Sequence, residues 1–479
     1  MTTSRDTFYI GGQWVAPATD RKFTLINAST EEVIGTVPEG TEADIDAAVA
    51  AARKAFDTSG WPQLSYAERA AVMERFMAAI AVRGEAIAQA VSAQNGMPVA
   101  VSSGLEGQFS VGIVQYYAEL AKTLGAPDIR PSQMGKETLV ERSAIGVVAA
   151  IVPWNFPVTL ALNKIAPAMA AGCTVVIKPS PGTVLDSYFL AEAAEEAGVP
   201  AGVLNWVAAD RAAGAHLVSH PGVDKVAFTG STGAGRSIAR TCGELLRPVS
   251  LELGGKSAAI LLEDVDIGTF LAGVPTACIL NSGQTCYSGT RILAPKSRYG
   301  EIVDALAGFV SSLTIGDALD PNTHIGPMAS SAHRDRVESY IAIGKQEARL
   351  VTGGGRPQDT NRGWFVEPTV FADVDNSDRI AKEEIFGPVL SVIPYDGEDE
   401  AVRIANDSEF GLGGSVWSAD GAHATDIARR VESGTVGING YMPSLGAPFG
   451  GIKSSGMGRE FGPEAISAYQ NTKSIYVMG

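Results

Sequence analysis

A cysteine in a loop of small polar residues is the first candidate for chemistry. Cys286 stands in NSGQTCYSG, residues 281–289, and it is one of only 4 cysteines in the chain. A cysteine that serves only for packing normally sits among aliphatic residues, where it behaves as a small hydrophobe. The surroundings of Cys286 therefore predict a nucleophile with room for a reactant beside it.

A carboxylate at the end of a predicted strand is the second candidate. Glu252 lies in LELGGK, residues 251–256, directly before a Gly-Gly turn. Burying a carboxylate costs free energy unless it is paired or used, and burial raises its pKa toward that of a useful base. Glu252 is therefore a candidate general base, although a structural glutamate in a salt bridge would fit the same pattern.

An amide between two prolines is the third candidate. Asn155 lies in PWNFP, residues 153–157, after the apolar run IGVVAAIV. The prolines restrict the backbone, and the amide could donate a hydrogen bond to an oxyanion. An Asx turn is the alternative, and it would be favoured if this segment stood alone.

The histidines do not indicate a metal or a protease. His216 and His220 are four residues apart, but HLVSH lacks the intervening glutamate of a zincin helix. We therefore expect no metal site. Nothing in the sequence places a histidine beside Cys286, as a Cys–His protease would require.

A glycine-rich segment could bind phosphate. The sequence has no GxGxxG, and the nearest pattern is FTGSTGAGR, residues 228–236, between a predicted strand and a predicted helix. Small residues at a helix N-terminus let a phosphate approach backbone N–H groups, but a turn that only packs tightly would look the same. Lys178 ends another strand and could hold a ribose hydroxyl or a phosphate, or it could be a solvated lysine. The acidic ribose partner of the dinucleotide fingerprint is missing, since Pro181 follows shortly after Lys178.

The elements that must position these residues alternate between strand and helix. From residue 145 we expect strands at IGVVAAIVP, CTVVIKP, VLNWVA, VDKVAFTG and PVSLELGG, with helices at 157–171, 183–197, 211–219 and 232–243. Such alternation predicts βαβ units and a parallel sheet, with the active site at the carboxyl ends of its strands. Similar alternation continues from Ser257 to about residue 440, with helices at 267–280 and 300–313.

The two ends of the chain differ from this pattern. After a lead segment at 8–15, the first 120 residues are expected to be largely helical, with capping boxes at Thr41–Asp44 and Ser65–Glu68. The final segment, AISAYQNTKSIYVMG, is predicted to be a strand whose edge must be covered.

Charge and cysteine usage limit the partners and the compartment. The net charge of −16 disfavours nucleic acid. The 4 cysteines form no CxxC pair, which fits a reducing, cytoplasmic compartment. The longest apolar run is far shorter than the roughly 20 residues that cross a bilayer, and we expect neither a membrane segment nor an export signal.

Taken together, the motifs resemble those of the NAD(P)-dependent aldehyde dehydrogenase superfamily, from about Phe8 to Val477. The resemblance depends on PWNFP, KPS, FTGSTGAGR, LELGGK, GQTC, EEIFGPV and PFGGIKSSGMGRE, and on their order. It implies an α/β fold with three parts. These are a Rossmann-like cofactor domain (1–122 and 143–253), an α/β catalytic domain (254–445) and a small bridging β element for oligomerisation (123–142 and 460–479).

The resemblance also implies a role for each matching residue. Cys286 is implied as the catalytic thiol, Glu252 as the general base and Asn155 as the oxyanion donor, while Glu460 would order water near the base. The implied cofactor contacts are Val152, Pro153, Trp154, Lys178, Ser180, Gly230, Ser231, Gly235, Leu253, Gly254, Glu384 and Phe386. The implied substrate-tunnel residues are Phe156, Leu160, Tyr287, Leu445 and Phe449.

The implied activity is oxidation of an aldehyde to the carboxylic acid through a thiohemiacetal and a thioester on Cys286. The tunnel positions are mostly apolar, so we expect aliphatic or aromatic aldehydes of moderate size. We favour NAD as the cofactor. NADP is the alternative, because Pro181 stands where NAD-preferring members often carry an acidic residue that binds the ribose hydroxyls, and its absence could leave room for a 2′-phosphate. Homodimers or homotetramers are implied. The alternatives are a CoA-acylating dehydrogenase, which usually lacks the base at Glu252, and a non-catalytic nucleotide-binding or structural relative.

Overall fold

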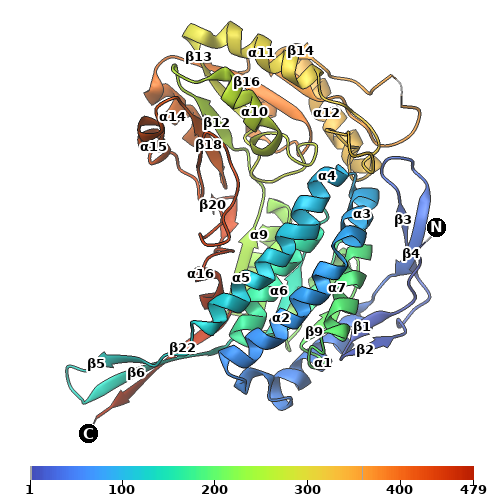
Figure 1. The fold of residues 1–479 in the computed structure, drawn as a ribbon, viewed down its shortest axis with the longest axis vertical. Helices are drawn as coiled ribbons and strands as arrows, with labels where there is room; N and C mark the ends of the chain where they lie inside the picture. Colours follow the sequence, from blue (N-terminus) through green and yellow to red (C-terminus); the bar gives the residue numbers. More distant parts are fainter. Residues whose placement is uncertain (1–2, 359, 479) are drawn as a thin grey trace.

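The first sheet in the chain is predominantly parallel and buried between helices. The computed structural model describes residues 3–358 and 360–478 (Figure 1). The sheet runs, in spatial order, through β2 (Gln13–Val15), β1 (Phe8–Ile10), β9 (Leu204–Trp206), β8 (Thr174–Lys178), β7 (Val147–Ile151), β10 (Lys225–Thr229), β11 (Val249–Glu252) and β21 (Gly456–Met457). The central strands β9, β8, β7, β10 and β11 are parallel, as predicted, and β2, β1 and β21 are antiparallel additions at the edges.

Side chains of strand β7 pack on both faces of this sheet. Val148 and Ala150 join one apolar cluster, and Val147, Ala149 and Ile151 join the other, because successive side chains of a strand point to opposite sides. The first cluster includes α2 (Tyr66–Val82), α3 (Gly84–Asn95), α5 (Ser110–Lys122) and α6 (Pro157–Ala171). The second includes α1 (Glu42–Thr58), α8 (Arg211–Ser219) and α9 (Thr232–Glu244), while α7 (Leu185–Glu196) contributes to both.

The N-terminal region contains more strand than the sequence predicted. Both capping boxes are present, at Thr41–Asp44 and Ser65–Glu68. The lead segment forms the hairpin β1–β2, and a second hairpin joins β3 (Lys22–Ile26) to β4 (Val33–Pro38). The prediction that residues up to 120 are largely helical after a short lead is therefore wrong for 22–38. The alternation of Phe23 and Leu25 with polar residues in β3 was a local signal for this hairpin that the prediction did not use.

The chain then forms a second sheet that is covered by helices on both faces (top of Figure 1). Its sheet runs through β14 (Arg349–Thr352), β15 (Thr369–Ala372), β16 (Val389–Tyr395), β13 (Arg291–Pro295), β12 (Ala258–Leu261), β18 (Gly414–Trp417) and β19 (Gly437–Ile438). One face packs on α10 (Ile267–Ala277) and α11 (Tyr299–Ser311). The other packs on α12 (Ser331–Glu347), α13 (Arg379–Lys382), α14 (Glu398–Asn406) and α15 (Gly421–Ala428).

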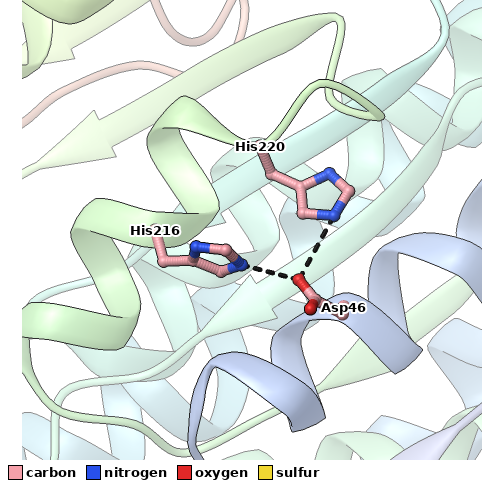
Figure 2. Close-up of side chains that lie close together, drawn as sticks. All are labelled: Asp46, His216 and His220. Atoms are coloured by element: carbon pink, nitrogen blue, oxygen red, sulfur yellow. Dashed lines mark hydrogen bonds and ion pairs between the residues drawn. The ribbon is translucent and has the colours of Figure 1, made fainter.

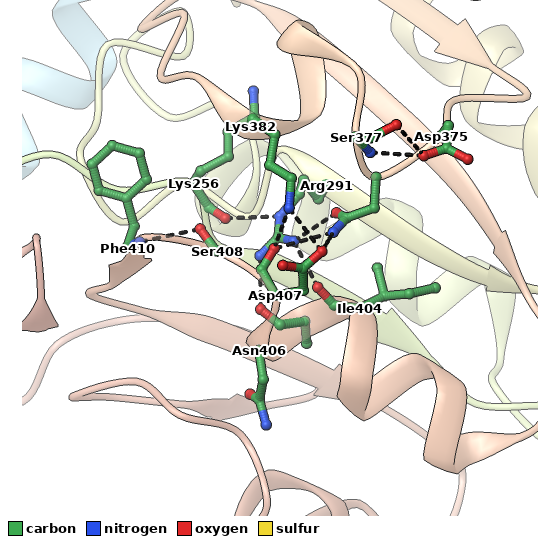
Figure 3. A network of polar contacts seen from close by, with 12 residues as sticks. Lys256, Arg291, Asp375, Ser377, Lys382, Ile404, Asn406, Asp407, Ser408 and Phe410 are labelled. Carbon is green, nitrogen blue, oxygen red and sulfur yellow. Dashed lines mark hydrogen bonds and ion pairs between the residues drawn. The ribbon is translucent and has the colours of Figure 1, made fainter.

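A buried arginine ties this second sheet to the segment that follows Glu252. The Arg291 guanidinium donates to the carbonyl oxygens of Lys256 (2.9 Å), Ile404 (2.9 Å) and Ala405 (2.9 Å) (Figure 3). Its remaining side-chain partner is the Asn376 amide oxygen at 3.0 Å. A buried charge needs such partners, and here they fix the backbone at Lys256, directly after the Gly-Gly turn of LELGGK.

A three-stranded sheet projects from the body and carries the C-terminus (lower left of Figure 1). It is antiparallel, in the order β22 (Gln470–Val477), β6 (Glu137–Ala144) and β5 (Asp128–Pro131). The prediction of one strand over 465–479 is wrong at its start, because Glu464–Ser467 form the short helix α16. Residue 479, the last of the predicted strand, lies outside the described residues. A smaller pair joins β17 (Phe410–Gly411) to β20 (Ile452–Lys453).

The helices differ from membrane spans in length and composition. Among residues 3–358 and 360–478, no single helix is both long and apolar enough to cross a bilayer. Only α2 and α3 together meet the length and composition, and they are bent by 63° relative to each other.

Candidate active site

The loop that carries Cys286 has an unusual backbone. Asn281, Ser282 and Gly283 have φ values of 52°, 55° and 76°, three consecutive residues in the left-handed region. A Cβ on Gly283 would lie 2.2 Å from the Gly387 carbonyl oxygen, so this position accepts only glycine. Left-handed conformations are costly for other residues and persist where the surrounding structure enforces them, often at functional sites.

The PWNFP loop and the Cys286 loop are joined by amide hydrogen bonds. Asn155 Nδ2 donates to the Gln284 carbonyl oxygen at 3.0 Å, and Asn281 Nδ2 donates to the Asn155 carbonyl oxygen at 3.0 Å. Asn95 Nδ2 also donates to the carbonyl oxygens of Trp154 (2.9 Å) and Asn155 (3.3 Å). An amide nitrogen carries two hydrogens, so Asn155 keeps one for a further acceptor.

These loops open onto a cleft of about 320 Å³ between the two α/β layers. Residues from both layers line it: Pro153, Trp154, Asn155, Thr229, Gly230, Ser231, Leu253, Gly254, Cys286, His333, Arg336, Glu384 and Phe386. Most of the residues predicted to bind cofactor are thus brought together beside the thiol. Thr229, His333 and Arg336 were not predicted. His333 and Arg336 belong to none of the sequence motifs, and Thr229 lies within FTGSTGAGR but was not singled out.

Aromatic rings form one wall of this cleft. Trp154 packs edge-on against His333, with ring centroids 5.1 Å apart, and against Phe386 at 5.4 Å. His333 Nε2 lies 2.7 Å from the Phe386 carbonyl oxygen, which makes that nitrogen the donor. Burial lowers the pKa of His333 to about 4, and the nearby Arg336 adds to this, so the ring is neutral at neutral pH.

Glu384 is fixed on the opposite side by backbone contacts. Its Oε1 accepts a hydrogen bond from Gly255 N at 2.9 Å, and its carbonyl oxygen accepts one from Arg336 Nη2 at 2.7 Å. A Cβ on Gly254 would lie 2.7 Å from Glu384 Oε2. Burial raises the pKa of Glu384 to about 7, so part of its population is neutral near neutral pH.

The start of α9 offers backbone N–H groups to the same cleft. Ser231 is the N-cap, and its hydroxyl accepts from Ala234 N. A Cβ on Gly230 would lie 2.5 Å from the Phe228 ring, and one on Gly235 would lie 2.4 Å from Leu253 Cδ2. These glycines let the turn pack closely on Phe228 and Leu253, and the N-terminus of α9 that follows is suited to a phosphate group of a dinucleotide.

Four predicted cofactor residues do not line this cleft: Val152, Lys178, Ser180 and Gly235, the last of which packs on Leu253. Lys178 is buried, and its Nζ donates to the carbonyl oxygens of Ala209 (2.7 Å) and Pro179 (2.9 Å). Burial lowers the pKa of Lys178 to about 8. Val152 lies just after the neighbouring strand β7, and its N–H donates to the Lys178 carbonyl oxygen. Ser180, two residues after Lys178, is half-buried.

Glu252 is buried at the end of β11, behind the cleft rather than among the residues that line it. Its Oε2 has no hydrogen-bond partner among the described residues, and a Cβ on Gly450 would lie 2.5 Å from its Oε1. Burial raises the pKa of Glu252 well above its usual range, and the Glu460 carboxylate raises it further. An orphaned carboxylate of this kind is suited to accept a proton from water.

A buried ion pair stands next to this carboxylate. Lys164 Nζ donates to Glu460 Oε1 at 2.6 Å and to Thr229 Oγ1 at 2.6 Å, and Asn163 Nδ2 donates to Glu460 Oε2 at 3.3 Å. The sequence resemblance singled out Glu460 but not Lys164, which lies in the middle of the apolar helix α6.

The Cys286 thiol is protonated in the absence of a bound partner. Burial raises its pKa, and the carboxylates of Glu384 and Glu252 raise it further. A thiolate forms at neutral pH only if a positive charge or a base comes close. The geometry thus provides a nucleophile that depends on what occupies the cleft.

The predicted tunnel residues belong to, or pack against, one apolar cluster that Cys286 also contacts. Phe156 and Phe449 are buried members of the apolar cluster against which Leu160, Cys286, Tyr287 and Leu445 pack. The ring centroids of Tyr287 and Phe449 are 6.3 Å apart, and those of Tyr287 and Tyr441 are 4.6 Å apart. Tyr441 and Phe461, which also packs on Phe449, were not predicted.

Comparison with known proteins agrees with this arrangement. Residues 14–475 match the sequence model of the "Aldehyde dehydrogenase family". The chain is 62% identical over 479 residues to a geranial dehydrogenase from Castellaniella defragrans, covering 100% of both chains. The chain belongs to the aldehyde dehydrogenase family. The resemblance inferred from the motifs is confirmed.

Solved structures of aldehyde dehydrogenases share the fold. An aldehyde dehydrogenase from Mycobacterium tuberculosis complexed with NAD+ superposes with a TM-score of 0.97 at 46% identity, covering 100% of this chain and 99% of that one. A mutant aldehyde dehydrogenase C from Pseudomonas syringae, complexed with NAD+ and octanal, gives 0.95 at 38% identity, covering 99% of each chain. The predicted fold class is confirmed, and as a member of this family the chain is an oxidoreductase that acts on aldehydes. The comparisons do not support the CoA-acylating alternative.

Away from the aldehyde dehydrogenase site, the structure brings together two histidines and an aspartate (Figure 2). Asp46 Oδ1 on α1 lies 2.6 Å from His216 Nε2 and 3.3 Å from His220 Nε2. His220 Nδ1 accepts a hydrogen bond from Gly222 N at 2.9 Å, so in the neutral ring Nε2 carries the proton. His220 then donates to Asp46 and has no lone pair for a metal. The cluster is therefore a hydrogen-bonded tie between α1 and α8.

Proposed function

We propose that the chain oxidises apolar aldehydes of moderate size, of the geranial type, to carboxylic acids with NAD+. The observation that carries this proposal is the position of Cys286, which lines the cleft and also packs against the apolar cluster that includes Phe156 and Phe449. A bound aldehyde could bury its hydrocarbon chain in the cluster and present its carbonyl carbon to the thiol. The geranial dehydrogenase relative and the octanal complex support this substrate class.

NAD+ is the cofactor that we assign to the cleft, and NADP+ is the alternative. The N-terminus of α9 would hold the pyrophosphate, Glu384 and Phe386 the nicotinamide ribose, and Lys178 with Ser180 the adenosine end. When bound, the oxidised nicotinamide accepts a hydride, and its positive charge favours the thiolate of Cys286. The NAD+ complex of the Mycobacterium tuberculosis relative supports the assignment.

In the first step that we assign, the Cys286 thiolate adds to the carbonyl carbon. A carbon–sulfur bond forms, and the carbonyl electron pair moves to oxygen, which gives a thiohemiacetal alkoxide. The free amide hydrogen of Asn155 and the backbone N–H of Cys286 would stabilise that oxyanion. Each such donor contributes on the order of 10²–10³ in rate.

In the second step, the alkoxide collapses as hydride leaves the carbon, and a thioester remains on Cys286. Glu252 takes a proton from water, and the resulting hydroxide attacks the thioester carbon. The carbon–sulfur bond breaks, the acid is released and the thiolate is restored. The raised pKa of Glu252 supports this role, because a stronger base removes a proton from water more readily.

We also propose a homodimer or homotetramer in a reducing, cytoplasmic compartment. The projecting sheet β22–β6–β5 supports oligomerisation, since its apolar side chains Ile129 and Tyr476 are exposed. The 4 cysteines are free thiols, which supports the compartment.

Steady-state kinetics with an aldehyde panel would test the function. Geranial, octanal, benzaldehyde and succinic semialdehyde would each be offered with NAD+ or NADP+, following the absorbance of the reduced nicotinamide. We expect kcat/KM for geranial or octanal to exceed that for succinic semialdehyde by at least about tenfold, since an apolar pocket disfavours a second carboxylate. Acid must form without CoA.

The control is Cys286→Ala, which should lose NADH production while circular dichroism shows an unchanged fold. Preference for the dicarboxylic semialdehyde would refute the substrate class. Turnover that survives in Cys286→Ala would remove the thiol from the reaction.

A further inference from the structure

A buried glutamate lies on a π-helix next to the oxyanion loop. Residues Ser103–Phe109 form this π-helix between α4 (Val99–Ser102) and α5, and Glu106 on it is fully buried. A π-helical segment is rare, and it commonly redirects a side chain at a functional site. Glu106 belongs to none of the motifs that carry the family resemblance, and it does not line the cleft.

The Glu106 carboxylate caps a helix that is distant in sequence. Its Oε2 accepts hydrogen bonds from Val158 N at 2.8 Å and Thr159 N at 3.4 Å, in the first turn of α6. The N-cap residue of α6 is Phe156, which supplies no side-chain cap. Glu106 thus provides the acceptor that a local Ser, Thr or Asp would normally provide, and its charge complements the helix dipole.

A second contact holds the same turn to the π-helix. Thr159 Oγ1 donates to the Leu105 carbonyl oxygen at 2.9 Å. Backbone and side chain at the start of α6 are therefore both attached to residues 105 and 106. The turn cannot shift along the helix axis without breaking these bonds.

The capped turn continues directly into the loop that carries Asn155. The far side of that loop is held by Asn95 and Asn281, which donate to the Asn155 carbonyl oxygen. Glu106 holds the near side through its hydrogen bond from Val158 N, two residues after Phe156. The orientation of the Asn155 amide thus depends on supports at both ends, and among these supports only Glu106 has an ionisable side chain.

The carboxylate is retained in a site that opposes its charge. Glu106 Oε1 has no hydrogen-bond partner among the described residues, and the same holds for Asp186 Oδ1 on α7. Burial raises the pKa of Glu106 to about 7 despite its hydrogen bonds. Burial also raises the pKa of Asp186, and the Glu106 carboxylate raises it further. An apolar side chain would avoid this cost, so a packing role alone does not account for a carboxylate here.

We propose that Glu106 is a positioning residue for the oxyanion donor: it caps α6 and thereby orients the Asn155 amide beside Cys286. The proposal rests on the proposed function, because it gives Glu106 a role only if Asn155 stabilises an oxyanion. Glu106 itself touches neither substrate nor cofactor. Its loss should weaken an interaction that is made in the transition state, so kcat should fall while KM for the aldehyde stays nearly constant.

A double-mutant cycle between Glu106 and Asn155 separates positioning from general stability. We would measure kcat, KM and the thermal midpoint of Glu106→Ala, Glu106→Gln, Asn155→Ala and the corresponding double variants. We expect Asn155→Ala to lower kcat by about 10²–10³ and Glu106→Ala to lower it by at least about tenfold. Glu106→Gln should be less impaired than Glu106→Ala, because the amide oxygen still accepts from Val158 N.

Non-additivity is the decisive result. In the Asn155→Ala background, Glu106→Ala should lower kcat by less than about twofold, since the group that it orients is gone. If Glu106→Ala does not fold, the same cycle with Glu106→Gln gives the answer. Asp420→Ala is the matched control: Asp420 caps α15 by accepting from Ala422 N (2.9 Å) and His423 N (3.1 Å), and it does not line the cleft. It should lower the thermal midpoint without changing kcat.

The outcomes distinguish this inference from the proposed function. Equal effects of Glu106→Ala in both backgrounds, or a lower thermal midpoint with unchanged kcat, would overturn the positioning role and leave the proposed function intact. Unchanged kcat in Asn155→Ala would overturn the oxyanion assignment itself, and the role of Glu106 with it.

Discussion

The reactive residues of this chain sit in surroundings that oppose their charged forms. The Cys286 thiol has a raised pKa because it is partly buried and faces the carboxylates of Glu384 and Glu252. The same burial raises the pKa of Glu252. At neutral pH, a larger fraction of both groups is therefore protonated than in water. A positive charge in the cleft would lower the pKa of the thiol and favour the reactive thiolate.

At the residue scale, the first prediction concerns the base. Glu252→Gln removes the proton acceptor for water, so steady-state turnover should fall by about 10²–10⁴. The acyl group should remain on Cys286, and mass spectrometry of the protein after reaction with an aldehyde and NAD+ should detect the added mass. Full turnover in this variant, with no acylated protein, would contradict the assignment.

A second residue-scale prediction concerns pH and His333. Its pKa in the folded protein is about 4, against an ordinary value of 6.5. The folded state therefore binds fewer protons than the unfolded state between these values, and stability falls as the pH drops from 6.5 toward 4. The loss attributable to one such group is at most about 1.4 kcal/mol per pH unit.

His333→Gln cannot titrate, so its free energy of unfolding should decline less over that range than that of the wild type, as measured by denaturant unfolding at several pH values. His324→Gln, at an exposed position, is the control for replacing a histidine by glutamine. An identical decline in His333→Gln would show that protonation of His333 does not contribute.

At the scale of elements, the Cys286 loop is positioned by shape rather than by regular structure. It follows α10, and its three left-handed residues turn the chain back so that Asn281 and Gln284 meet Asn155. On the opposite side the Gly255 backbone packs so closely that a Cβ there would lie 2.3 Å from the Cys286 carbonyl oxygen. The thiol is thus fixed by two close backbone approaches that require glycine.

The prediction at this scale is that Gly283→Ala damages both stability and activity. The added Cβ would meet the Gly387 carbonyl oxygen at 2.2 Å, and φ is 76°, so we expect a loss of more than about 1 kcal/mol and a lower kcat. Thermal unfolding and steady-state kinetics would measure the two effects.

Gly308→Ala provides the matched control. Gly308 lies inside α11, and a Cβ there would meet no side chain and no other element within 4 Å. The change should therefore stabilise the protein by up to about 1 kcal/mol with kcat unchanged. Similar behaviour of the two alanine variants would show that the loop tolerates a Cβ.

At the scale of the whole molecule, the projecting sheet lies apart from the cleft and carries exposed apolar side chains. Ile129, Met134, Tyr476 and Met478 are 55%, 88%, 70% and 68% exposed. A groove of about 590 Å³ runs where this sheet meets the body, lined by residues that include Leu120, Val140 and Ile466. The division of the chain into a cofactor domain, a catalytic domain and a bridging element stays a prediction, and so does the oligomeric state.

We predict that charge on this sheet weakens assembly. Ile129→Glu with Tyr476→Glu should lower the molar mass measured by light scattering, because apolar surface at an interface would be replaced by carboxylates. Val82→Glu is the control, since Val82 is 82% exposed on α2, outside the projecting sheet. A protein that is monomeric without any substitution would exclude the predicted oligomer.

The sequence by itself determined those features that depend on neighbours along the chain. The capping boxes and the alternation of strands and helices from 145 to 255 could be predicted, because periodicity and capping are local. The identity of Cys286, Glu252 and Asn155 as candidates came from the residue types around each. The family followed from the order of the motifs.

Only the tertiary structure decided which of these residues meet and what else surrounds them. It placed Glu252 behind the cleft beside Lys164 and Glu460, added His333 and Arg336 to the lining, and revealed the cap from Glu106 to α6. The physical reason is that such contacts join residues far apart in the chain. Their partners are selected by long-range packing, which local patterns do not encode.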